Sequence, residues 1–130
     1  MENQKYTDLT VYKECRRLRI AVSEVIKTKF PPSERFLLTA QLLDASRSIT
    51  ANIAEGHGRY YYQDNIRFCR IARGSLEETL EHLVTAYDEK YVSADFLKGF
   101  KQKHEACIML LNGYIRYLRK SKRGKADDEN

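Results

Sequence analysis

Two groups of basic side chains in this chain have the spacing to neutralise nucleic-acid phosphates. Arg116, Arg119, Lys120 and Arg123 recur at helical spacing, and residues 116–125 hold six basic side chains and no acidic one. Such a cluster can follow a phosphate backbone along one face of a helix. The alternative is a solvated helix end, because cations also suit the negative end of the helix dipole.

The second basic group surrounds three consecutive tyrosines at positions 60–62. Arg59 precedes them, and Arg67 and Arg70 follow five and eight residues after the last tyrosine. Arginines interleaved with aromatic rings are typical of platforms on which single-stranded nucleic acid stacks. The alternative is a tyrosine-rich loop that packs on the neighbouring helix ends.

Two helix faces are too polar for an ordinary core stripe and too regular for a loop. The first belongs to residues 41–55, where polar side chains recur at spacings of three and four. The second includes Gly74, which costs about 1 kcal/mol relative to alanine inside a helix, so we expect another backbone to approach it closely. We expect the two faces to meet, as a hydrogen-bonded layer inside the fold or as a subunit interface or ligand groove. The candidate packing or interface residues are Gln41, Ser48, Asn52, Glu55, Gly74, Ser75 and Glu78.

No residue pattern here supports catalysis or a resident cofactor. A di-metal site in a helical bundle needs several inward carboxylates with Glu-x-x-His pairs, and Glu78 with His82 has too few partners. No glycine-rich phosphate loop and no nucleophile motif is present. His57, between two glycines, is predicted to be a loop residue. The sequence therefore predicts no enzyme, no catalytic residue, no metal and no cofactor.

Four amphipathic helices are expected to position these residues. The first spans about residues 8–29, with apolar residues at alternating spacings of four and three, and ends at Pro31 and Pro32. Ser33 is the expected N-cap of the second helix, which ends between residues 55 and 58. Gly56 and Gly58 are expected to supply a left-handed cap there. The apolar stripe of the first helix consists of Val11, Cys15, Leu18, Val22 and Val25.

The third helix should start near Gln63 or Asp64, and the fourth should start after an N-cap at Ser93. The apolar positions of the fourth include Phe100, Cys107, Leu111 and Leu118. No alternating strand pattern appears, so we expect an all-α, antiparallel up-down-up-down four-helix bundle. Residues 1–120 form this single domain, and residues 121–130 are expected to be a disordered charged tail.

Composition narrows the class of protein. The 130 residues carry a net charge of +5, and three cysteines lie at apolar positions, one in each of three predicted helices. An odd number of unpaired cysteines favours buried thiols in a reducing cytoplasm. No apolar run is long enough to cross a membrane, and the polar N-terminal residues lack the core of a signal peptide. We therefore expect a cytoplasmic protein without a membrane partner.

Three blocks of sequence resemble one known family. They are LTAQLLDASRSITANIAEGHGR at 38–59, FCRIARGSLEE at 68–78 and LNGYIRYL at 111–118. With the opening DLTVYKE and the FPPSERF turn, the chain is similar over residues 8–120 to the proteins encoded in 23S rRNA intervening sequences. Thr50 stands where the family pattern has proline, and Asp44 lies near a position that is often basic.

This resemblance implies an antiparallel four-helix bundle that assembles into a homopentamer. It also implies distant kinship with the accessory proteins of diversity-generating retroelements, which are basic pentamers that bind a reverse transcriptase and nucleic acid. The combined prediction is an oligomeric, non-enzymatic bundle that binds RNA or an RNA-processing partner, such as a nucleic-acid enzyme, through its basic surfaces. The alternative is a protein–protein adaptor or scaffold with no direct nucleic-acid binding.

Overall fold

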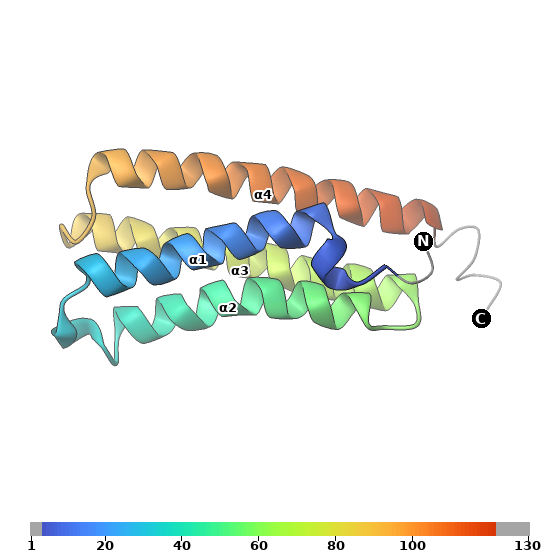
Figure 1. Cartoon of the computed structure of the whole chain (residues 1–130), viewed down its shortest axis with the longest axis horizontal. Coiled ribbons are helices and arrows are strands. Elements are labelled where there is room, and N and C mark those ends of the chain that lie inside the picture. The colour runs from blue at the N-terminus through green and yellow to red at the C-terminus, as the bar shows by residue number, and fades with distance from the viewer. Residues whose placement is uncertain (1–3, 122–130) are drawn as a thin grey trace.

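In the computed structural model, which describes residues 4–121, four long helices lie side by side (Figure 1). They are α1 (Thr10–Lys29), α2 (Leu38–His57), α3 (Tyr62–Asp88) and α4 (Ala94–Ser121). Two short 3-10 helices, η1 (Tyr6–Asp8) and η2 (Pro32–Glu34), flank α1, and the described residues contain no strand. The all-α, four-helix part of the prediction is confirmed.

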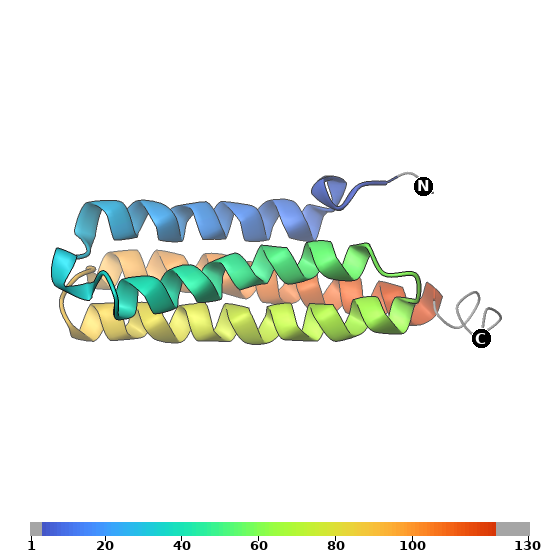
Figure 2. The same cartoon turned by 90° about the horizontal axis from the view of Figure 1, so that it is seen from below.

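Each helix contacts two neighbours rather than three. α1 packs against α2 and α4, α3 packs against the same two helices, and the diagonal pairs do not approach. Consecutive helices run in opposite directions along the long axis (Figures 1 and 2). As a result, the end of α2, the start of α3 and the end of α4 share one end of the bundle.

The apolar stripes predicted from sequence form the core. Cys15, Leu18, Val22 and Val25 of α1 are buried, as are Phe100, Cys107, Leu111 and Leu118 of α4. The prediction for these eight positions is confirmed. Their regular spacing keeps each stripe on one side of its helix, which is the geometry that lets four helices share one core.

Two sequence predictions about helix ends are wrong. Ser33 lies inside η2 and does not cap α2; the Glu34 carboxylate accepts a hydrogen bond of 3.2 Å from the Leu38 amide instead. Gly56 and Gly58 do not adopt a left-handed conformation, because Gly56 continues α2 and Gly58 has φ −78°. The cap predicted at Ser93 is confirmed, since its hydroxyl accepts a bond of 3.0 Å from the Phe96 amide.

Gly56 serves close packing rather than chain reversal. A Cβ atom at this position would lie 2.6 Å from Asn65 Oδ1 and 3.0 Å from Phe68 Cβ. The absence of a side chain therefore lets the end of α2 press against the first turns of α3. The opposite holds at Gly74, where the expected close approach is not found: the residue is exposed, and a Cβ there would meet nothing within 4 Å.

Candidate nucleic-acid interface

The two basic groups, about fifty residues apart in sequence, lie at the same end of the bundle (Figure 1). One group surrounds the connection from α2 to α3, and the other occupies the last turns of α4. All of their described members are exposed. We call this surface the basic end; it consists of Arg59, Arg67, Arg70, Arg116, Arg119 and Lys120. Arg123 and residues 122–130 of the predicted tail lie outside the described residues, whereas Ser121, where that tail was predicted to begin, is the last residue of α4.

Nearby acidic and aromatic groups hold part of the basic end in place. Arg59 Nη2 lies 2.9 Å from Glu55 Oε2, and Arg67 Nη2 lies 3.7 Å from Asp64 Oδ1. Both guanidinium groups also lie 4.8 Å from the centre of the Phe68 ring, in cation–π geometry. Exposed ion pairs of this kind contribute little to stability, so a phosphate can replace the carboxylate at small cost.

A hollow of about 480 Å³ opens at this end of the bundle. Its walls come from the N-terminal segment, the α2–α3 connection and the last turns of α4, so no single element forms it. The lining residues are Gln4, Asp8, Leu9, Thr10, His57, Arg59, Tyr62, Asn65, Tyr114, Tyr117 and Leu118. Aromatic rings and hydrogen-bonding groups thus converge beside the exposed cations.

Asn65 organises the floor of the hollow. Its side-chain amide donates a hydrogen bond of 3.2 Å to the Tyr114 hydroxyl, and its carbonyl oxygen accepts one of 3.6 Å from the Cys69 thiol. Burial raises the pKa of Tyr114, although the bond from Asn65 opposes the shift. The phenol therefore stays neutral at physiological pH. The Tyr114 ring in turn stacks on the Tyr117 ring, with 6.2 Å between centroids and 15° between planes.

Sequence reasoning missed several residues of this hollow. Asn65, Tyr114 and Tyr117 were not predicted to be site residues, and His57, predicted to be a loop residue, is the last residue of α2 and lines the hollow. One signal was present: tyrosine and arginine alternate through residues 114–119, and arginines flank the three tyrosines at residues 60–62. Each run alone looks like an amphipathic helix end, and only their meeting forms a hollow.

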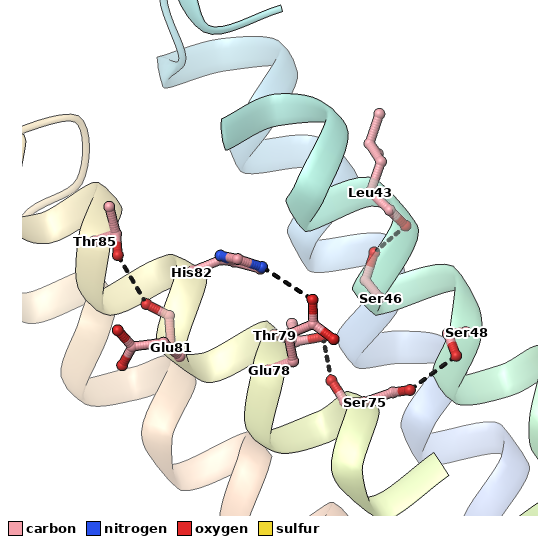
Figure 3. Close-up of polar contacts among 9 residues, drawn as sticks. All are labelled: Leu43, Ser46, Ser48, Ser75, Glu78, Thr79, Glu81, His82 and Thr85. Atoms are coloured by element: carbon pink, nitrogen blue, oxygen red, sulfur yellow. Dashed lines mark hydrogen bonds and ion pairs between the residues drawn. The ribbon is translucent and has the colours of Figure 1, made fainter. Parts of the chain in front are cut away.

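The polar faces of α2 and α3 meet at one point (Figure 3). The hydroxyl groups of Ser48 and Ser75 lie 2.8 Å apart, and Ser75 also accepts a bond at its carbonyl oxygen from Thr79. Asn52 stays on α2, where its amide donates to the Ser48 carbonyl at 2.8 Å and to the Ser48 hydroxyl at 2.9 Å. The predicted contact between the faces is therefore confirmed for Ser48 and Ser75.

The remaining members of these faces point to solvent within the single chain. Gln41, Glu55 and Glu78 are exposed. Glu55 forms an ion pair with Arg59, and Glu78 Oε2 lies in hydrogen-bond contact with His82 Nε2 at 3.2 Å. Both contacts join residues one helical turn apart. A polar layer that includes these charged residues does not form inside the bundle, because both carboxylates have local partners and water.

A second hollow, of about 460 Å³, lies between α1 and α2. Arg19, Lys27 and Arg47 line it beside one carboxylate, that of Glu24. Arg19 also donates a bond of 2.8 Å to the buried Thr50 hydroxyl, which joins the two helices. No local sequence pattern predicts this basic groove, because its cations come from two different helices.

The three thiols are free and buried, as predicted. Burial raises the pKa of the Cys69 thiol to about 12. A hydrogen bond with Cys107, together with burial, raises the pKa of Cys15 well above its usual range. A thiol with a raised pKa is a poor nucleophile at neutral pH.

Between residues 4 and 121, no three His, Cys, Asp or Glu side chains are grouped so that they could hold a metal ion. Within the same range, no helix has the length and apolar character needed to span a membrane.

Comparisons with other proteins agree with the fold. A crystal structure at 1.70 Å of a protein of unknown function from the S23 ribosomal protein family of Bacteroides thetaiotaomicron superposes with a TM-score of 0.74. The match is 21% identical in sequence and covers 82% of this chain and 98% of the other, so it supports the shared fold. A search of curated proteins gives no match. The family model of the 23S rRNA-intervening sequence proteins matches residues 7–113. The chain therefore belongs to the 23S rRNA-intervening sequence protein family.

Proposed function

We propose that this protein binds RNA through the basic end of the bundle, as a binding protein rather than an enzyme. The observation that carries the proposal is the convergence of exposed cations from the α2–α3 connection and from α4 around one end. Each phosphate that such cations neutralise releases counterions, which supplies sequence-independent affinity. We place this activity in the cytoplasm, where three unpaired thiols remain reduced.

We further propose that the copies assemble into a ring, the homopentamer that the family resemblance implies. Charge is divided along α3: arginines 67, 70 and 73 occupy its first half, and acidic residues dominate from Glu77 onward. Separated poles favour head-to-tail contacts, which close into rings when the rotation permits. A ring would repeat the basic end around an axis, so weak phosphate contacts would add as avidity.

A salt titration with matched charge variants tests the RNA proposal. The test variant carries Arg59→Gln, Arg116→Gln and Arg119→Gln at the basic end. The control carries Lys98→Gln, Lys101→Gln and Lys103→Gln, which remove the same charge from exposed positions in the first half of α4. RNA affinity measured at two salt concentrations should fall steeply with salt for the wild type and the control. The slope should shrink by about 0.7 to 0.9 for each phosphate contact that the test variant loses.

A protein–protein adaptor is the second candidate, because one apolar patch lies away from the basic end. Phe36 is 82% exposed and Leu37 is 62% exposed, and both lie in the connection between α1 and α2. Large apolar side chains gathered on a surface mark contacts with other proteins. The titration separates the two functions: absent binding at low salt, or equal slopes for test and control variants, would favour the adaptor.

Light scattering tests assembly independently of RNA. A homopentamer has five times the 15.2 kDa mass of the chain. A mass of one chain at all concentrations used for RNA binding would reject the ring. Any RNA binding would then be a property of the single subunit.

A further inference from the structure

We propose that the hollow at the basic end takes one unpaired base of a single-stranded RNA, so the protein distinguishes single strands from duplexes. This inference rests on the proposed RNA binding and adds a ligand to a specific cavity. The volume of about 480 Å³ falls within the range of roughly 300–1,000 Å³ that is usual for small-molecule sites.

The charges inside the hollow favour a neutral group over a phosphate. Its lining carries one carboxylate, Asp8, and one guanidinium, Arg59, and that guanidinium is already paired with the Glu55 carboxylate at 2.9 Å. The other cations of the basic end are exposed and do not line the hollow. A strand that followed those cations would keep its phosphates outside, and the group left to enter would be a base.

The aromatic surface is positioned before any ligand arrives. Tyr117 is 62% exposed, yet its ring stacks on Tyr114, whose hydroxyl accepts the bond from the buried Asn65. The position of Tyr117 therefore depends on a fixed neighbour rather than on the ligand. A flat ring held in this way offers a stacking surface to any base, since every base has an aromatic face.

The polar groups of the lining match the edges of a base. Gln4 offers a donor and an acceptor, and Asp8 offers acceptors. One oxygen of Asp8 already accepts the Lys5 amide at 3.2 Å, which orients the carboxylate. In a duplex the base edges are paired and the base faces are stacked, so only a splayed, unpaired base can make both kinds of contact.

The test compares single-stranded and duplex RNA. The probes are a labelled 12-nucleotide oligouridine and the same strand annealed to oligoadenosine, titrated into the full chain at low salt. The variants are Tyr117→Ala, Tyr117→Phe and, as a control, Tyr87→Ala. Tyr87 is also exposed but lies near the end of α3, at the other end of the bundle (Figure 1).

The wild type should bind the single strand more tightly than the duplex. Tyr117→Ala should weaken single-strand binding by about five- to a hundredfold and leave duplex binding and the salt slope unchanged. Tyr117→Phe, which keeps the aromatic ring, should bind the single strand as the wild type does. Equal affinity for both probes, or equal effects of Tyr117→Ala and Tyr87→Ala, would overturn the inference while the RNA proposal stands. Failure to bind either probe would instead overturn the RNA proposal, and this inference with it.

Discussion

The hydroxyl groups of Ser48 on α2 and Ser75 on α3 lie 2.8 Å apart, and they make the direct polar contact between the two faces singled out in the sequence. Ser75 is buried, and the Asn52 amide holds Ser48 in place. This partly buried hydrogen bond sets the rotation of α2 relative to α3, because turning either helix about its axis would separate the two hydroxyl groups.

Loss of this bond should destabilise the fold by a measurable amount. Ser75→Ala should lower the free energy of unfolding by about 1 kcal/mol, since it leaves the Ser48 hydroxyl without its cross-helix partner. Ser48→Ala should behave similarly, and the double variant should lose less than the sum of the two. Urea unfolding of the four proteins measures this coupling. Strict additivity would mean that the contact contributes nothing to stability.

The core prediction concerns Leu18 and Leu111, both of which are fully buried. Replacement of either by alanine should lower the free energy of unfolding by about 2–5 kcal/mol, because the change removes apolar contacts and leaves a cavity. Met109→Ala serves as the control, since Met109 is on the same helix as Leu111 and exposed. A comparable loss at Met109 in the monomer would contradict the helix orientation described here.

Two of the helical glycines, Gly56 and Gly74, should respond to alanine with opposite signs. Gly56→Ala should be destabilising, because the new methyl group would collide with Asn65 and Phe68. Gly74→Ala should raise the free energy of unfolding by about 0.5–1 kcal/mol, since Gly74 has open space and alanine is the better helix former. Thermal unfolding at a fixed concentration measures both. If Gly74→Ala instead lowers the mass seen by light scattering, the open surface at Gly74 is a subunit contact.

The end of the bundle opposite the basic end contains a pH-sensitive contact. The Tyr91 hydroxyl donates a bond of 2.7 Å to Glu34 Oε2. This bond, with smaller contributions from desolvation and from the nearby Glu34 and Glu89 charges, raises the pKa of Tyr91 from 10.0 to about 12. The folded state favours the neutral phenol, so the stability that the bond contributes is fully present below pH 10. It should be lost as the pH rises from 10 to 12.

Tyr91→Phe tests this pH dependence. The variant lacks the titrating hydroxyl, so its free energy of unfolding should decline less than that of the wild type between pH 10 and 12. Denaturant unfolding at several pH values provides the comparison. Tyr87→Phe is the control, because Tyr87 is exposed on the neighbouring α3. Parallel curves for wild type and Tyr91→Phe would show that the contact does not form.

Much of the fold could be predicted because helix signals are local. The spacing of Cys15, Leu18 and Val22 identifies a buried stripe, Pro31 stops the first helix, and the Ser93 hydroxyl caps the fourth. Each of these depends on residues within a few positions of one another. The prediction of a cap at Ser33 was wrong because a competing group, the Glu34 carboxylate, accepts the hydrogen bond from the Leu38 amide. Glu34 belongs to a 3-10 helix that the sequence pattern does not predict.

The candidate site depends on contacts that no local pattern encodes. Asn65 and Tyr114 are forty-nine residues apart, and their bond exists because α3 and α4 pack in opposite directions. The same packing brings Arg59 and Arg116 to one end of the bundle. It also decides that Gly56, rather than Gly74, is the glycine that another helix presses against. Periodicity tells which side of each helix is apolar, but the rotation and pairing of helices follow from side chains that meet only after the chain has folded.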